Sequence, residues 1–410
     1  MVKVKFLWKT VRDIDVNGKQ ILMRADYNVP LNADGTIADD FRVEASVPTV
    51  KYLTERGAKV VLISHLGRPK SKADTQFSLR PVAEDLSRKL GQKVEFVDDC
   101  IGEEVSRKTA KMTKGEVVLL ENLRFYPEEK ADDRGFAKKL AKDSHAEIFV
   151  QDGFGVVHRA HASTSAITEF LPSVAGLLLE KEYVEIKSAT DDPNRPMTAI
   201  MGGAKISDKI PLVEKFVEIA DNVVIGGAMA NNFLKHEGKN VAHSLVENDV
   251  DGIIDGIMAK VREKWGADFS RNFILPTDVA IASDGDFHSE RVEVSLADNP
   301  LYGDAAIFDL GSETIKKIRE TIANSGTVIW NGDLGIDNVP QFSRASIGAA
   351  EAMTRTHIIS VVGGGDTADF ARHWDKLKGG SFTHVSTGGG ASLELMAGDK
   401  LPGIEALLRK

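Results

Sequence analysis

Cysteine, long apolar runs and excess positive charge are all scarce in this sequence. Cys100 is the only cysteine, which excludes an internal disulfide and a thiolate cluster for structural zinc. No run of about 18 apolar residues occurs, and the segment MVKVKFLWKTVRDIDV lacks the apolar stretch and cleavage site of a signal peptide. These absences predict a protein of a reducing compartment. We expect a cytoplasmic location and no membrane association.

The charge balance limits the class of ligand. The formal net charge of -9 disfavours a nucleic-acid partner or a polybasic membrane anchor, because both need a positive excess. A small anionic substrate remains compatible, since it needs only a local cluster of Arg or Lys. Nothing in the sequence demands an oligomer, so we expect a monomer.

Short β-branched runs alternate with stretches of helical periodicity, which is typical of βα units around a parallel sheet. The runs form two sets, 20–25, 59–63, 93–97, 116–120 and 147–151, then 198–201, 222–225, 273–275, 305–308, 327–330, 357–362 and 382–385. The 410 residues exceed the roughly 250 to 300 at which one core stops growing. The sequence predicts an α/β protein with two doubly wound, Rossmann-like parallel-sheet domains, 1–170 and 191–392, joined by a hinge helix at 171–190.

Arginines and carboxylates follow the strands predicted in the first half. Functional residues of open parallel sheets gather beyond the carboxyl ends of the strands. The residues there are Arg24, Asp26, Asn28, His65, Arg68, Glu121, Arg124, Asp152 and Arg159, with Arg42 nearby in sequence. Guanidinium groups present paired donors that stay charged, which suits capture of phosphate and carboxylate. Surface ion pairing could explain any one arginine, but several at consecutive strand ends favour an anion site.

Three histidines in this half allow another interpretation. His65, His158 and His161 could be metal ligands or acid–base groups, and the last two are three residues apart, as on one helical face. No third ligand stands at a familiar spacing. We therefore favour hydrogen-bond donation to phosphate, or a role in loop structure.

Glycine clusters follow nearly every strand predicted in the second half. They are Gly202–Gly203, Gly226–Gly227, Gly311, Gly332, Gly363–Gly365 and Gly388–Gly390. Glycine lets backbone N–H groups approach a phosphate, and a following helix adds the positive end of its dipole. Tight turns would explain one or two clusters but hardly six. We therefore predict a nucleotide site.

Two other functions remain compatible with these patterns. A Walker A motif is absent, but Gly363-x-Gly365-x-x-Ala368 satisfies a relaxed dinucleotide fingerprint, which fits a nicotinamide-dependent dehydrogenase. That hypothesis leaves Lys205 and Lys209 without a role. The second alternative is a nucleotide-binding protein that has lost its chemistry; the complete set of charged residues argues against it.

Ordered motifs along essentially the whole chain resemble the phosphoglycerate kinase family. RADYNVPL (24–31) resembles the family's N-terminal signature, and SHLGRP, LENLRF, HRAH, GGAKISDK, GGGDTA and HVSTGGGASLEL follow in the family's order. The resemblance implies a hinge-bending enzyme of glycolysis and gluconeogenesis that moves a phosphoryl group reversibly from 1,3-bisphosphoglycerate to MgADP, giving 3-phosphoglycerate and MgATP. It also implies that about 393–410 packs back on the N-terminal domain.

The resemblance assigns roles to two groups of residues. Those implied to hold the phosphoglycerate are Asp26, Asn28, Arg42, His65, Arg68, Arg124 and Arg159. Those implied to hold the nucleotide phosphates are Lys205, Lys209, Gly363, Gly364, Gly365, Asp366 and Thr367, with Asp366 as the Mg²⁺ ligand. The strand ends add Gly203, Gly227, Gly311 and Asn331 to the predicted nucleotide site.

The loop at Asn331 departs from the family pattern. The family usually has NGP-x-GVFE, whose glutamate binds the nucleotide ribose, whereas this chain has NGDLGIDN, with Asn338 in the glutamate's place. An amide donates as well as accepts hydrogen bonds and carries no charge, which leaves the preferred nucleotide base open. Gly153 is a milder departure, since the family commonly has alanine there.

The implied reaction needs charge stabilisation more than acid–base chemistry. The attacking oxygen is already anionic and the departing carboxylate is a weak base, so no general base is required. We hypothesise that Arg42 and Lys205 converge on the transferring group. Lys209, Gly364 and the helix after Gly365 would join them in stabilising charge on the phosphoryl oxygens.

Overall fold

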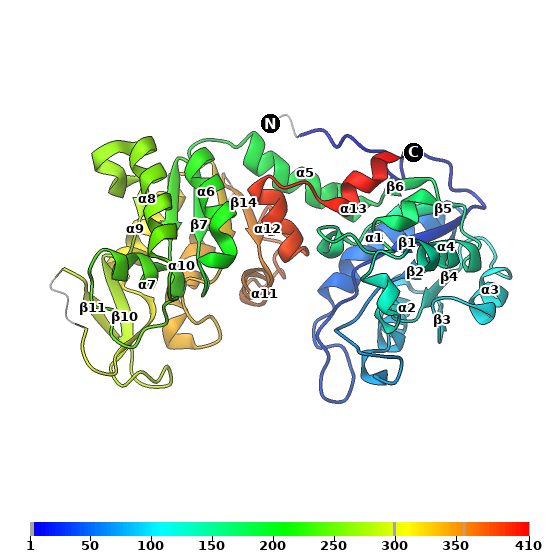
Figure 1. The fold of residues 1–410 in the computed structure, drawn as a ribbon, viewed down its shortest axis with the longest axis horizontal. Helices are drawn as coiled ribbons and strands as arrows, with labels where there is room; N and C mark the ends of the chain where they lie inside the picture. Colours follow the sequence, from blue (N-terminus) through cyan, green and yellow to red (C-terminus); the bar gives the residue numbers. More distant parts are fainter. Residues whose placement is uncertain (1–3, 298–300, 356, 410) are drawn as a thin grey trace. The chain divides into compact units, whose positions relative to one another are not determined.

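The computed structural model describes residues 4–297, 301–355 and 357–409. Its contacts divide the chain into an N-terminal unit, Lys5–Val184 with the residues from Asp399 on, and a C-terminal unit, Val4 with Glu185–Gly398. Helix α5 (Leu177–Asp191) crosses the division between Val184 and Glu185, so one helix belongs to both units (Figure 1). No helix among the described residues combines the length and the apolar character needed to cross a lipid bilayer.

A six-stranded parallel sheet of order β3-β4-β2-β1-β5-β6 forms the centre of the N-terminal unit. Its strands are β1 (Gln20–Arg24), β2 (Lys59–Ile63), β3 (Val94–Val97), β4 (Val117–Leu120), β5 (Ile148–Gln151) and β6 (Ser173–Ala175). The covering helices are α1 (Phe41–Glu55), α2 (Arg80–Leu90), α3 (Glu103–Thr109) and α4 (Arg134–Asp143). Because side chains alternate along a strand, Ile21 and Met23 join the core beneath α1 and α2, whereas Leu22 joins the core beneath α3 and α4.

The end of the chain belongs to the same unit. Helix α13 (Pro402–Glu405) and the 3-10 turn η9 (Ala406–Arg409) follow Asp399. The Gly403 N–H donates to the carbonyl oxygen of Val157 (2.8 Å), and Ile404 is buried. The tail therefore lies against the loop that carries His158 and Arg159.

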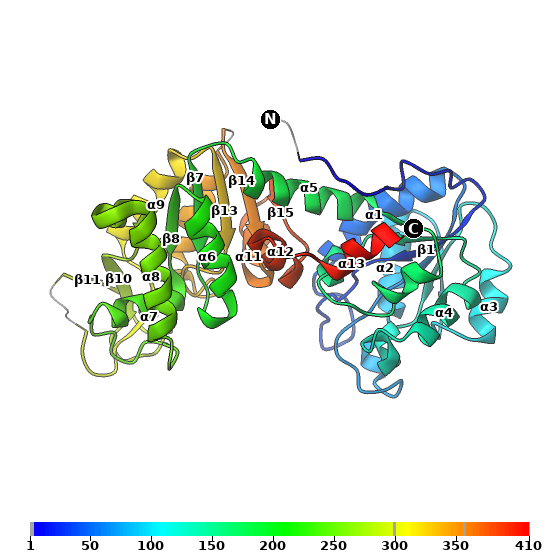
Figure 2. The ribbon, with the colours of Figure 1, turned by 45° about the horizontal axis from the view of Figure 1, so that its top comes forward.

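A second six-stranded parallel sheet, of order β15-β14-β13-β7-β8-β9, forms the centre of the C-terminal unit. Its strands are β7 (Met197–Met201), β8 (Asn222–Ile225), β9 (Phe273–Ile274), β13 (Thr327–Asn331), β14 (Ile359–Gly363) and β15 (His384–Val385). The helices are α6 (Ile210–Ile219), α7 (Gly227–His236), α8 (Asp251–Trp265), α9 (Ser312–Ala323), α10 (Arg344–Met353), α11 (Gly365–Trp374) and α12 (Gly390–Ala397). Helices α9, α10 and α11 share one core with the sheet, while α6 packs with α8 and α12 on the other side (Figure 2).

The predicted fold class is confirmed, and one part of the C-terminal unit was not predicted. Strands β10 (Asp278–Ala282), β11 (Val292–Ser295) and β12 (Ala306–Leu310) form a separate antiparallel sheet of order β11-β10-β12. The placement of 305–308 among the parallel strands was therefore wrong. Strand β6 was also missed, because it lies within the segment expected to be helical from residue 171, and α5 begins only after Gly176.

Candidate functional site

The carboxyl ends of β1 and β2 bring four predicted phosphoglycerate ligands together. Asp26 and His65 are nearly buried, and His65 Nδ1 lies 4.0 Å from Asp26 Oδ1. Arg42 Nε lies 3.8 Å from Asp26 Oδ2, and Arg42 Nη1 donates to the carbonyl oxygen of Asn28 (2.5 Å). Helix α1 supplies Arg42 from its first turn. The four residues therefore lie close together beyond the carboxyl ends of β1 and β2.

The loop after β2 connects Asn28 to Arg124. Asn28 Oδ1 accepts from the Gly67 N–H (2.8 Å), and Arg124 Nη1 donates to the Gly67 carbonyl oxygen (2.7 Å). Gly67 has a φ of 61°, and a Cβ there would strike the ring of Phe77, so glycine is required. Arg68 follows and is exposed.

Arg24 is fully buried behind this cluster and determines the tautomer and the charge of the His65 ring. Its Nε donates to Ser163 Oγ (2.9 Å), and its Nη2 lies 3.1 Å from His65 Nδ1. A guanidinium can only donate, so His65 Nδ1 accepts and the ring proton is on Nε2. Burial, then the charges of Arg24 and Arg124, lower the pKa of His65 well below its usual value. His65 is therefore a neutral ring that can offer one N–H to a ligand.

Glu129 is the buried carboxylate that accompanies Arg24. It accepts from Ser163 Oγ (2.6 Å) and from the Ser163 N–H (3.0 Å). Burial raises its pKa, which the charge of Arg24 opposes. Neither Glu129 nor Ser163 was singled out from the sequence. Both lie away from strand ends, and no sequence signal marks them.

Positive charge outweighs negative charge around these predicted phosphoglycerate-binding residues. Burial and the charges of Arg24 and Arg159 lower the pKa of Arg124 to about 10, and Arg124 Nε is buried without a hydrogen-bond partner. Burial and neighbouring arginines also lower the pKa of His158 to about 4 and that of His161 to about 3. An anion bound here would supply both the missing negative charge and the missing acceptors.

Two observations bear on the alternative that the histidines of this cluster bind a metal or act in acid–base chemistry. Arg159 is exposed, and its Nε donates to His158 Nε2 (3.0 Å), so that nitrogen is occupied. Within residues 4–297, 301–355 and 357–409, no three His, Cys, Asp or Glu side chains are grouped so as to hold a metal ion. The neutral histidines of this cluster suit hydrogen bonding to an anion.

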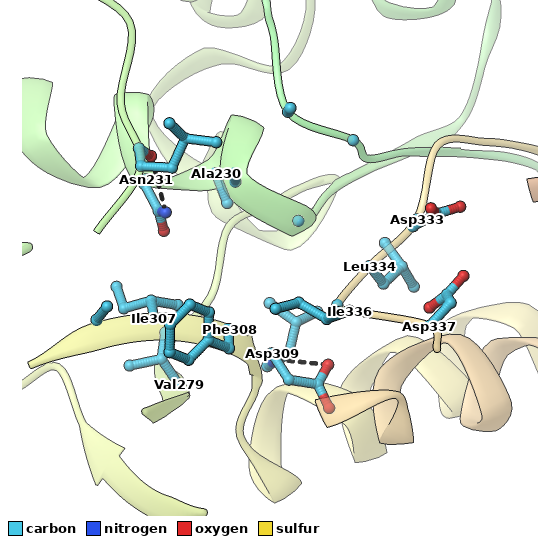
Figure 3. A pocket seen from close by; sticks show the side chains of 18 of the residues that line it. Ala230, Asn231, Val279, Ile307, Phe308, Asp309, Asp333, Leu334, Ile336 and Asp337 are labelled. Carbon is cyan, nitrogen blue, oxygen red and sulfur yellow. Dashed lines mark hydrogen bonds between the residues drawn. The ribbon is translucent and has the colours of Figure 1, made fainter. Parts of the chain in front are cut away.

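The C-terminal unit contains a cavity of about 910 Å³ at the carboxyl ends of its strands. Its volume falls in the range of small-molecule sites. Figure 3 shows apolar side chains on one side, including Val279, Ile307 and Phe308, and the carboxylates of Asp309, Asp333 and Asp337 around the loop after β13. Among the predicted nucleotide residues, those that line the cavity are Gly203, Gly227, Asn338 and Asp366.

The glycines of this unit serve two different purposes. The N–H groups of Gly203, Gly227 and Gly311 donate to the carbonyl oxygens of Asp333 (2.8 Å), Leu334 (3.2 Å) and Asp278 (3.1 Å). These glycines let neighbouring loops pack closely. Gly365, in contrast, begins α11 and has no atom within 4 Å of where a Cβ would stand. Open space at a helix N-terminus therefore occurs at Gly365 and at Gly389, which precedes α12, and not at every glycine cluster.

The turn before α11 gathers further predicted residues. Gly363 ends β14, and Gly364, with a φ of 95°, precedes α11 beside the Asn331 side chain. Asn331 is 1% exposed, and neither its Oδ1 nor its Nδ2 has a hydrogen-bond partner. Thr367 Oγ1 accepts from the Gly332 N–H (2.8 Å). A buried amide without partners beside a helix N-terminus is suited to a polar ligand.

The two predicted lysines have different environments. Lys209 Nζ donates to the Gly202 carbonyl oxygen (2.8 Å). Burial lowers the pKa of Lys209 to about 8, against the opposing charges of Asp333 and Asp366. Lys205 is exposed on the loop after β7. Lys209 is therefore held in place within the unit, whereas Lys205 projects into solvent.

The loop after β13 carries two carboxylates where the family pattern has proline and phenylalanine. Asp333 Oδ1 accepts from Thr367 Oγ1 (3.2 Å). Burial and the charge of Asp366 raise the pKa of Asp333, and burial and the charge of Asp333 raise that of Asp337. Asn338 is exposed at the cavity. The cavity is thus more acidic than the family motif implies.

Comparisons with known proteins agree with one another. The family model described as phosphoglycerate kinase matches residues 11–399. Phosphoglycerate kinase of Pelotomaculum thermopropionicum is 42% identical over 98% of this chain and 99% of its own length. That of Chlorobium phaeobacteroides is 45% identical over 97% and 99%. A solved phosphoglycerate kinase structure from Coxiella burnetii has a TM-score of 0.83 at 32% identity and covers 98% of both chains. One from Pyrococcus horikoshii OT3 has a TM-score of 0.82 at 31% identity and covers 97% and 98%.

Proposed function

Since the chain belongs to the phosphoglycerate kinase family, we propose that it transfers a phosphoryl group reversibly from 1,3-bisphosphoglycerate to MgADP. The products are 3-phosphoglycerate and MgATP. One observation carries most weight: arginines outnumber the carboxylates around a neutral His65 in one unit, and a helix N-terminus opens near Lys209 in the other. Each unit thus offers a site for one anionic substrate.

The N-terminal unit binds the phosphoglycerate in this proposal. Arg124 and Arg159 contribute fixed positive charge, and His65 donates from Nε2. Arg42 is kept in position by Asn28 and Asp26. Arg68 adds an exposed charge at the edge of the site. None of these residues has to exchange a proton with the substrate, because the reacting oxygens are already anionic.

The C-terminal unit binds the nucleotide phosphates at the first turn of α11, where the helix dipole and Lys209 favour negative charge. Asp366 lies in that turn at the cavity, and its carboxylate fits a Mg²⁺ that takes few protein ligands. When bound, Mg²⁺ neutralises charge on the nucleotide phosphates. Lys205 and Arg42 are proposed to meet at the transferring group when the two units close, which also excludes water that would hydrolyse the acyl phosphate.

The direct test is ATP formation from 1,3-bisphosphoglycerate, with MgADP and MgGDP compared as acceptors. Turnover with either supports the proposal, and the ratio gives the base preference that Asn338 leaves open. No turnover with either nucleotide refutes it. NADH binding that is unaffected by MgADP would favour the dehydrogenase alternative, and nucleotide binding without turnover would favour a protein that has lost its chemistry.

Substitution separates the two catalytic charges from ordinary surface charges. We expect Arg42→Ala or Lys205→Ala to lower kcat by roughly two or more orders of magnitude, as loss of transition-state charge stabilisation does. Matched controls are Arg80→Ala and Lys260→Ala, which remove exposed ion pairs with Asp98 and Glu214. Near-normal kcat in a folded Arg42 or Lys205 variant contradicts the assigned role.

A further inference from the structure

Arg291 makes a set of buried contacts that neither the motifs nor the proposed mechanism uses. It directly precedes β11, and its side chain is only 5% exposed. Nη1 donates to Asp309 Oδ2 (2.7 Å) and to the Gln341 carbonyl oxygen (2.9 Å). Nη2 donates to the Leu310 carbonyl oxygen (2.7 Å) and to Glu293 Oε1 (3.0 Å). One guanidinium thus joins three separate segments of the chain.

Two of these segments form the wall of the nucleotide cavity. Strand β12 contributes Ile307, Phe308 and Asp309, and the loop after β13 contributes the residues from Asp333 to Asn338. Figure 3 shows Asp309 at the end of its strand, facing the part of the loop that carries Ile336. Arg291 therefore lies behind the cavity wall, at the junction of strand and loop.

The loop after β13 folds back on itself, and it stays folded only if its far end, near Phe342, is held in place. The Ile336 N–H donates to the Phe342 carbonyl oxygen (2.9 Å), and the Phe342 N–H donates to the Val339 carbonyl oxygen (2.8 Å). A Cβ at Gly335 would strike both Phe342 and Asp309, so the two sides approach closely. Arg291 holds Gln341, the residue before Phe342. Its contacts therefore fix the turn that presents Asn338 to the cavity.

Asp309 connects Arg291 to the start of helix α10. Its carboxylate accepts from the Arg344 N–H (3.0 Å) at the start of α10 and from the Leu310 N–H (2.9 Å). It is fully buried, and Arg291 supplies its ion pair. Arg291 therefore has two roles. Removing it would leave the buried Asp309 carboxylate without its ion pair. It would also remove the contact that supports the loop at Gln341.

We propose that Arg291 is a positioning residue for the nucleotide: through Asp309 and the Gln341 carbonyl it holds the wall formed by β12 and the loop at Asn338 in its binding geometry. A preorganised wall saves the free energy of ordering the loop when the ligand binds. The proposal rests on the assignment of the cavity to the nucleotide. It adds a specific residue that contacts neither substrate.

A pair of variants separates positioning from simple stability. Arg291→Met removes the guanidinium and leaves Asp309 buried without its ion pair, which lowers the Tm. Adding Asp309→Asn removes that carboxylate and keeps one oxygen, which can accept from the Arg344 N–H in place of Oδ2, while the hydrogen bond from the Leu310 N–H to Oδ1 is lost, so the Tm recovers in part. In both variants the loop after β13 lacks the hydrogen bond from Arg291 to the Gln341 carbonyl oxygen. We expect the Kd of MgADP to rise about tenfold in both variants, as loss of preorganisation costs affinity. The Kd of 3-phosphoglycerate should not change.

The control is Arg319→Met, which removes an exposed ion pair with Glu351 in the same unit. It should leave both dissociation constants unchanged. In steady-state assays the KM for MgADP should rise in the Arg291 variants, with kcat within about twofold, since the reacting groups are untouched. If affinity for MgADP recovers together with the Tm in the double variant, or is unchanged in Arg291→Met, positioning by Arg291 is wrong. If the wild-type protein binds no nucleotide, the proposed function fails together with this inference.

Discussion

His65 illustrates how one buried neighbour decides what a binding residue can do. Its Nδ1 is occupied by Arg24, so only Nε2–H is available to the phosphoglycerate that the proposed function assigns to this site. His65→Gln keeps a donor near the position of Nε2, whereas His65→Asn places its donor near that of Nδ1. We expect the Kd of 3-phosphoglycerate to rise less in His65→Gln than in His65→Asn, by about tenfold in relative terms, as for loss of a hydrogen bond to a charged group.

The pH dependence of binding provides the check on this assignment. Because burial and Arg24 hold the pKa of His65 well below its usual value, the ring does not titrate between about pH 6 and 8, the range of an ordinary histidine. The ratio of the wild-type Kd to that of His65→Gln should therefore stay constant over this range, measured by isothermal titration calorimetry. A ratio that falls as the pH drops through the ordinary histidine range would show that the charged ring binds the ligand.

The candidate residues could be predicted as far as strand ends and motifs identify them. Asp26, His65 and Arg124 follow predicted strands, and the structure places them together. Arg24 was predicted as a strand-end residue, but its burial and its contact with His65 depend on packing between β1 and β2 that no local pattern encodes. Glu129 lies in the short turn η3 (Pro127–Glu129), and its partner is 34 residues away in sequence. Their roles in substrate binding remain predictions.

At the scale of secondary structure, helix α5 is positioned by a carboxylate that follows β5. Asp152 Oδ1 accepts from the N–H groups of Leu178 (2.9 Å) and Leu179 (3.3 Å) in the first turn of the helix. Burial raises the pKa of Asp152 to about 7, against the hydrogen bonds from Thr49, Leu179 and Leu178. The helix that belongs to both units therefore begins at a titrating group.

This arrangement predicts a local loss of stability as the pH rises. A carboxyl group with a raised pKa in the folded state contributes its stability fully below its unfolded pKa, near 4, and loses it as the pH rises through about 7. A tenfold change in a protonation equilibrium corresponds to about 1.4 kcal/mol. We expect amide protection in α5 to fall from about pH 5 to pH 8 in the wild type relative to Asp152→Asn, which keeps an acceptor but does not titrate. Hydrogen exchange with mass spectrometry measures this. Parallel pH profiles for the two proteins would contradict it.

The sheets show which elements a sequence can specify. Strands β2 and β8 have the bounds predicted for them, 59–63 and 222–225, because continuous apolar runs buried on both faces are easy to recognise. Strand β11 was missed because its residues are mostly exposed, so it shows no buried run. Strand β10, which follows β9 after three residues that include Pro276, was not predicted, and local pattern does not assign the two strands to different sheets. Strand pairing between distant segments decides that assignment.

For the whole molecule, the division into two units has a direct thermodynamic consequence. If each substrate binds one unit, each ligand stabilises only the amides of that unit. The gain for a ligand at about 100 times its Kd is about 2.7 kcal/mol. We expect 3-phosphoglycerate to slow hydrogen exchange in the loops that carry His65 and Arg124. MgADP should slow it at the first turn of α11 and in the loop at Asn338.

Adding 3-phosphoglycerate and MgADP together tests whether the two units close around the substrates. Under the proposed function the substrates have to meet in line for phosphoryl transfer, which predicts that the two units close about the segment they share. We expect exchange in α5 to slow with both ligands by more than the sum of the separate effects, because ordering by one ligand lowers the cost of ordering by the other. The matched control is the Arg42→Ala variant with both ligands, which lacks a charge at the proposed meeting point. Additive protection in α5 would mean that binding does not couple the units through this helix. Protection of the α11 turn by 3-phosphoglycerate alone would contradict the assignment of one substrate to each unit.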